Sequence, residues 1–112
     1  MTTKKKLIFD ALKSVVPNTH YADSLNTQLP RARFSLIHHD SVRYSNKRHG
    51  QRLIYQVDYF SNRALEVEID TTLWGIINAL EDSNLLTSDW REAPDVDEKA
   101  NRTVWHYWLE VR

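Results

Sequence analysis

Five histidines are the residues of this chain best suited to acid–base or metal chemistry. His38 and His39 stand directly before Asp40, and we expect His49 and His106 on neighbouring strands. Adjacent residues of a strand point to opposite faces, so His38 and His39 cannot both ligate one metal without a bulge. The chain also lacks the H-E-x-x-H and H-x-H spacings. We therefore predict solvated or interfacial histidines, with no metal site; an enzyme that uses His38, His39 and His106 is the alternative.

Carboxylates form the second group with possible chemistry. Glu66 and Asp70 are four residues apart on the outer face of a predicted helix, which favours a solvated charged face. Residues 95–98, which include Asp95 and Glu98, lack the glycine and the terminal Glu of a calcium loop. We therefore predict neither an acid–base pair nor a cation site here.

Other routes to catalysis are excluded by composition. Gly50 and Gly75 are the only two glycines, and phosphate-binding loops need several. The chain contains no G-x-S-x-G motif and no cysteine, which removes a nucleophile elbow, thiolate catalysis and thiolate metal sites. We predict a protein that is not an enzyme and binds no cofactor.

Basic residues gather on a predicted hairpin at 43–52, which two tyrosines, Tyr44 and Tyr55, flank. The basic residues are Arg43, Lys47, Arg48, His49 and Arg52. Such a tip could contact phosphates, or a base could stack on an aromatic ring. The domain as a whole is neutral, however, whereas nucleic-acid-binding domains are usually basic. We therefore keep a small nucleic-acid-binding or regulatory protein as the alternative, and expect DNA contact to be non-specific.

Charge is divided between the two halves of the chain. Residues 1–52 hold ten Lys/Arg and three Asp/Glu, and residues 53–112 hold five and twelve, giving formal charges of +7 and −7. If folding leaves these charges on different faces, the molecule is suited to head-to-tail packing with its own copies. The halves could equally interleave and neutralise each other.

Aromatic residues are concentrated at the end of the chain, at positions 105–108. Because this segment alternates as a strand, both of its faces carry a large ring, and only one face can belong to the core. Trp108 and Trp90 are therefore candidates for a protein interface, where Trp is enriched. Burial under a helix is the other reading for Trp105 and for Trp108.

Periodicity predicts the elements that position these residues. Apolar residues at helical spacing indicate helices over 5–16 and, after a start signal at 61–62, up to 82. Alternating residues indicate strands over 31–44, 51–60 and 103–111, a short strand over 85–92, and an acidic loop over 93–102. Residues 20–30 read as a loop with at most a short extended piece near Tyr21.

These elements predict a single α+β domain over residues 1–112, in the order α-β-β-α-β-β. We expect an antiparallel or mixed sheet of about four strands, a long β-hairpin, and both helices on one face. No segment approaches the roughly 20 apolar residues of a membrane span, and no signal-peptide pattern is present. We expect synthesis in the cytoplasm.

The chain resembles the tail completion, or tail terminator, proteins of long-tailed bacteriophages. The resemblance covers nearly the whole chain and lies in structural pieces: a short helix ending at Pro17, a Tyr-Ala-Asp at 21–23, a strand after Pro30, the run Tyr-Gln-Val-Asp-Tyr-Phe at 55–60, a long helix, and a closing aromatic strand. This chain differs in its shorter first helix and its strongly basic hairpin.

The resemblance implies a structural virion protein of the tail or neck, made in the host cytoplasm. Its subunits form a ring, often a hexamer, that caps the tail tube and joins it to the head connector, with DNA passing through the lumen. A closed ring needs complementary patches on two faces of each subunit. We expect one patch at Arg43, Lys47, Arg48 and Arg52, and the other at acidic residues such as Glu66, Asp70, Asp95 and Glu98.

Overall fold

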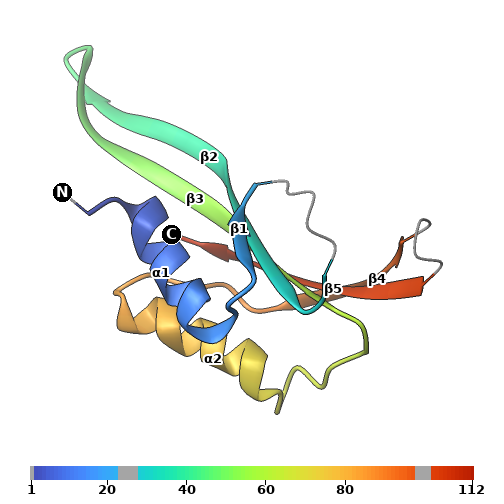
Figure 1. Ribbon diagram of the computed structural model, residues 1–112. Helices are drawn as coiled ribbons and strands as arrows, with labels where there is room; N and C mark the ends of the chain where they lie inside the picture. Colours follow the sequence, from blue (N-terminus) through green and yellow to red (C-terminus); the bar gives the residue numbers. More distant parts are fainter. Residues whose placement is uncertain (1, 23–27, 98–101) are drawn as a thin grey trace.

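The computed structural model describes residues 2–22, 28–97 and 102–112, and within them the side chains of residues 42, 48, 49, 96, 97 and 102 are left aside. Two helices lie against one face of a sheet (Figure 1). The elements are α1 (Lys4–Val15), β1 (Thr19–Tyr21), β2 (Arg31–Tyr44), β3 (Lys47–Ser61), α2 (Thr71–Asp82), β4 (Arg91–Asp97) and β5 (Arg102–Val111). Both helices have 12 residues, and neither helix in these ranges has the length and apolarity for crossing a bilayer.

The sheet has five strands in the order β1-β2-β3-β5-β4. The β1–β2 pair is parallel and the other pairs are antiparallel, so the predicted α+β class and mixed sheet are confirmed. The prediction of about four strands was wrong, because β1 is a fifth strand, in a segment without alternation. Hydrogen bonds to β2 hold this segment as a strand: Ala32 N–H donates to Asn18 C=O, and Ala22 N–H donates to Phe34 C=O.

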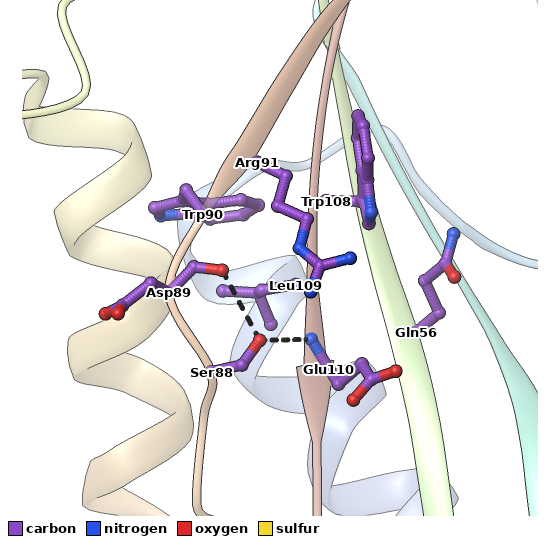
Figure 2. Close-up of a pocket in the computed structure, with 8 residues that line it drawn as sticks. All are labelled: Gln56, Ser88, Asp89, Trp90, Arg91, Trp108, Leu109 and Glu110. Atoms are coloured by element: carbon purple, nitrogen blue, oxygen red, sulfur yellow. Dashed lines mark hydrogen bonds between the residues drawn. The ribbon is translucent and has the colours of Figure 1, made fainter.

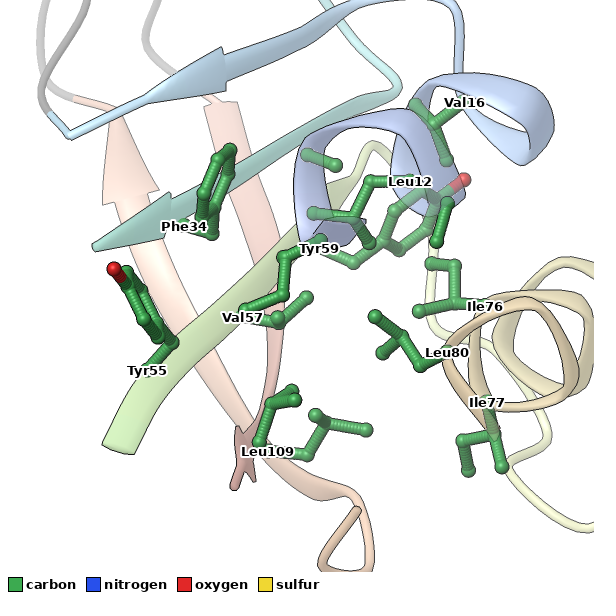
Figure 3. Packing of buried hydrophobic residues seen from close by; sticks show 14 of the residues in the cluster. Leu12, Val16, Phe34, Tyr55, Val57, Tyr59, Ile76, Ile77, Leu80 and Leu109 are labelled. Atoms are coloured by element: carbon green, nitrogen blue, oxygen red, sulfur yellow. The ribbon is translucent and has the colours of Figure 1, made fainter. Parts of the chain in front are cut away.

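The core lies between the helices and one face of the sheet (Figure 3). Ile76 and Leu80 of α2 and Leu12 of α1 are fully buried opposite Val57 and Leu109 of the sheet. The helices also pack on each other. A Cβ added at Gly75 would lie 3.3 Å from Val15 Cγ1, so the small residue permits close approach of α2 to α1.

Three predicted boundaries were wrong. The strand predicted over 51–60 begins at Lys47, because Ser45 and Asn46 alone form the turn before it. The second helix begins at Thr71, because the Asp70 carboxylate caps it by accepting from the backbone N–H groups of Thr72 and Leu73 at 3.1 and 3.0 Å. Leu65 lies before the helix and donates its N–H to the Tyr107 hydroxyl. Its spacing from the apolar residues of the helix had wrongly indicated a helical position. The fourth strand covers Arg91–Asp97 and not 85–92, so part of the expected acidic loop pairs with β5.

Candidate assembly surfaces

The long hairpin extends well beyond the rest of the sheet. β5 pairs with β3 only as far as Tyr55, and β1 pairs with β2 only as far as Phe34. Beyond these points β2 and β3 pair with each other alone, and we call residues 37–54 the arm. Among the described residues, no third strand pairs with either outer edge of the arm, and Figure 1 shows it projecting from the body. An isolated two-stranded ribbon is only marginally stable in water, so the arm has unused pairing capacity.

The tip of the arm combines an aromatic ring with positive charge. Ser45 and Asn46 both have positive φ, 53° and 64°, which gives the two-residue turn that matches the twist of a hairpin. Tyr44 and Lys47 face each other across this turn, and the Tyr44 side chain is 64% exposed. Arg43 and Lys47 are exposed as well. The tip therefore presents one exposed ring, with Lys47 opposite it and Arg43 next to it in the chain.

The middle of the arm is held by polar contacts across its two strands. Arg52 donates to the Asp40 carboxylate at 2.6 Å, and His38 lies 3.2 Å from the same oxygen. The hydrogen bond from Arg52, together with that from His38, lowers the pKa of Asp40. Arg52, predicted as part of a free basic patch, is thus engaged inside the arm. Arg43 and Lys47 keep the predicted position, and the Arg48 side chain is outside the described part.

The strand register places His38 and His106, which were predicted to cluster, far apart. His38 pairs with Ile54 of β3, whereas His106 pairs with Phe60, six residues further along the same strand. At about 3.3 Å per residue the two histidines are roughly 20 Å apart. No group of three or more potential metal ligands occurs among the described residues.

The predicted acidic patch is spread over two elements. Glu66 is exposed in the turn before α2, and the Asp70 carboxylate is occupied as the helix cap. Asp95 lies on β4 and has a partner of its own. Glu98 falls outside the described residues. The Glu66–Asp70 pair on one helix face was a wrong prediction, because neither residue belongs to the helix.

A second exposed cluster lies at the start of α2, and the sequence patterns did not single it out. Ile69 is 75% exposed and Trp74 is 44% exposed, with the exposed carboxylates of Glu66 and Glu68 beside them in the chain. We call these four residues the α2-start patch. The available signal was the position of Trp74, which lies off the apolar stripe of its helix, and the prediction instead placed Ile69 on that stripe.

The two predicted interface tryptophans have different positions. Trp90 is partly buried: it packs against the core and donates its indole N–H to the Leu73 carbonyl of α2 at 3.1 Å. Trp108 is also half-buried, but it lies on the opposite face of the sheet, which neither of the two described helices covers. Neither side chain is fully buried, and Trp108 is the one without a helix over it.

The helix-free face of the sheet holds a buried carboxylate. Asp58 is 1% exposed and accepts hydrogen bonds from Gln56 at 2.8 Å and Arg33 at 3.3 Å, with His106 Nε2 2.6 Å away. Burial alone would raise the pKa of Asp58. The hydrogen bonds with His106 and Gln56 and the nearby Arg33 charge outweigh burial, so the pKa is lowered.

Stacked rings lie beside this carboxylate on the same face. The rings of Phe60 and His106 stack with centroids 4.6 Å apart, and the ring of Trp108 lies 4.9 Å from that of His106. The guanidinium groups of Arg31 and Arg33 lie 4.6 and 5.1 Å from the Phe60 centroid. Because these ring faces already have neighbours, the stack offers little open surface on which a nucleic-acid base could lie.

A polar groove of about 520 Å³ runs beside this stack, next to Trp108. Figure 2 shows Arg91, Asp89 and Glu110 around it, with the Ser88 hydroxyl accepting from the Glu110 N–H at 2.8 Å. One guanidinium and two carboxylates line the groove, so it favours neither an anion nor a cation. We therefore regard the arm and the α2-start patch as the stronger candidate surfaces. No protein-family model and no curated protein matches this chain.

Proposed function

We propose that this chain is a structural subunit that assembles head to tail into a ring, as a tail completion or tail terminator protein of a long-tailed bacteriophage. The observation that carries the proposal is the arm. It is a two-stranded ribbon with a basic aromatic tip, and no third strand of the described residues pairs with its outer edges. The molecule with its arm measures 55 Å along its longest axis. Such a ribbon gains most of its stability by contacting another molecule.

The distribution of charge supports a contact between unlike faces. The strand order puts β1 and β2, from the positive half of the chain, at one edge of the sheet. It puts β5 and β4, from the negative half, at the other edge. Contacts between unlike faces are heterologous, and they close into rings when the rotation between subunits permits. Opposite charges also favour the correct docking orientation.

In this role the ring, a hexamer by resemblance to the phage family, caps the tail tube and meets the head connector. Its place is the tail or neck of the virion, and DNA passes through its lumen without sequence-specific contact. The tail tube protein, the connector protein and other copies of the chain are its partners.

The test is the mass of the assembly in solution. Native mass spectrometry and light scattering of the full chain should find a closed oligomer, alone or on addition of tail tube protein, and the oligomer should weaken at high salt. A variant with Asn-Gly in place of residues 40–52 should remain monomeric and fail to bind the tube. A wild-type chain that stays monomeric and ignores the tube protein would contradict the proposal.

Exposure of the arm tip favours one second function, the binding of nucleic acid by the arm. Tyr44 is open to solvent, with Arg43 next to it in the chain and Lys47 opposite it, an arrangement in which a base can stack while cations contact phosphates. A gel-shift series in increasing salt tests this. Binding that falls steeply with salt and is abolished by Lys47→Glu supports it, and an absence of binding at low salt rejects it.

A further inference from the structure

We infer that the α2-start patch of one copy receives the arm tip of the next copy. This inference rests on the proposed ring and names its two contacting surfaces. Both surfaces pair exposed apolar groups with charge, and the charges are opposite. Tyr44 accompanies Arg43 and Lys47 on the tip, and Ile69 and Trp74 stand beside Glu66 and Glu68 on the patch.

The patch is rigid before any partner arrives. The Glu66 carbonyl accepts the N–H groups of both Ile69 and Asp70, at 3.0 and 2.8 Å, which closes the turn. The Trp74 indole N–H donates to the Glu68 carbonyl at 2.9 Å, so the ring is held across that turn. A surface fixed in this way loses little conformational entropy on binding, and Trp is the residue most enriched at binding hot spots.

The local charges of the patch are negative as a set. Within the described residues, the carboxylates of Glu66 and Glu68 form no ion pair. The same segment also holds one cation, Arg63, and one further carboxylate, Asp70, so these two charges cancel in the sum. A partner with an aromatic side chain and two cations therefore matches the patch in both charge and apolar character.

The two surfaces lie at opposite ends of the subunit. In Figure 1 the arm tip and the segment leading into α2 are far apart, so one copy cannot satisfy its own patch. Contact between the tip of one copy and the patch of another is heterologous, as a ring requires. The edge of β4 is a weaker acceptor for the arm, because Pro94 near its centre has no N–H for strand pairing.

Charge exchange provides the test. Reversing the tip with Arg43→Glu and Lys47→Glu, or the patch with Glu66→Lys and Glu68→Lys, should weaken self-association of the full chain by roughly tenfold or more, because like charges then meet. An equimolar mixture of the two variants should associate again, since each tip now faces a patch of opposite charge. The control is Asp82→Lys with Asp89→Lys, which makes the same change of net charge as the patch reversal, at exposed sites elsewhere, and should associate like the wild type.

Cross-linking gives an independent readout, because the chain has no cysteine of its own. Mixed Tyr44→Cys and Ile69→Cys chains should form an intermolecular disulfide when an oxidant is added. Mixed Tyr44→Cys and Asn78→Cys chains should not, although Asn78 is also exposed on α2.

The outcomes separate this inference from the proposed function. If the wild type associates but both reversed variants associate equally well, or the mixture stays dissociated, the ring stands and this contact is rejected. Binding of the tip to the tail tube protein or to nucleic acid, with self-association unchanged by tip reversal, also rejects it. If the wild type never associates, alone or with the tube protein, both proposals fail together.

Discussion

At the scale of single residues, Asp58 is the group with the most demanding environment. It is a buried carboxylate whose contacts come from residues on two other strands, Arg33 of β2 and His106 of β5. These partners lower its pKa, so the folded state holds the charged form more firmly than the unfolded chain does. The resulting stabilisation is complete above the ordinary Asp pKa and is lost as the pH falls through the lower, folded-state pKa.

Asp58→Asn should therefore reduce the free energy of unfolding at pH 7 by about 2–3 kcal/mol, somewhat less than for a fully enclosed ion pair, because Arg33 is partly exposed. The difference between variant and wild type should shrink in acid, below about pH 4, where the wild-type chain gains a proton on unfolding. Urea unfolding at several pH values measures both effects. The control is Asp40→Asn on the exposed arm, which should change stability much less. An Asp58→Asn deficit that is equal at pH 7 and pH 3 would contradict this account.

Tyr107 makes a contribution to stability that is lost at high pH, whereas the contribution of Asp58 is lost at low pH. Burial, together with a hydrogen bond to the Glu92 carboxylate, raises the pKa of Tyr107 to about 12. The unfolded phenol ionises near pH 10, so the stabilisation is complete below that pH and is lost as the pH rises from about 10 to 12. Tyr107→Phe should remove this alkaline component and cost about 1–2 kcal/mol at neutral pH through the lost hydrogen bonds. Ultraviolet phenolate titration is the measurement, and an ordinary titration midpoint for Tyr107 would count against the burial argument.

At the scale of elements, the contact between α1 and α2 depends on Gly75. Two effects of Gly75→Ala oppose each other: about 1 kcal/mol of gained helix propensity and the tight 3.3 Å approach to Val15. Gly75→Ala alone should thus change the free energy of unfolding by less than about 0.5 kcal/mol. In a Val15→Ala background the same change should stabilise by up to about 1 kcal/mol, since the obstructing methyl groups are gone. A double-mutant cycle in urea measures this coupling, and strictly additive effects would contradict a steric conflict between a Cβ at position 75 and Val15.

At the scale of the whole molecule, the arm and the body have separate roles. The core lies between the helices and the part of the sheet in which β3 pairs with β5. Leu53, at the base of the arm, packs against this core, and residues 40–52 lie beyond it. Replacing residues 40–52 with Asn-Gly should accordingly leave the thermal midpoint of the isolated subunit within a few degrees of the wild-type value, while self-association is lost. Calorimetry at a concentration where both chains are monomeric gives the comparison. A large drop in the midpoint would mean that the arm belongs to the folded core, and that its loss tests folding and not assembly.

Local sequence determined the parts of this fold in which a segment reveals its own environment. The strands at 31–44 and 103–111 were predicted correctly, because alternation of apolar and polar residues reflects one buried face. The α+β class was also readable, since it depends on residue types and short spacings. Periodicity gave a wrong prediction at Leu65, because its spacing continues the helical period although the helix begins only after Asp70.

Tertiary structure alone decided the features that depend on register between distant strands. Asp58 and His106 are 48 positions apart, and only the β3–β5 pairing brings them together. β1 exists as a strand because β2 offers it an edge, and Trp90 is partly buried because α2 lies against it. The sequence contained two halves of opposite charge, and the strand order placed β1 and β2 of the first half and β5 and β4 of the second half at opposite edges of the sheet. Pairing energies between segments far apart in the chain set these outcomes, and no short window of sequence contains them.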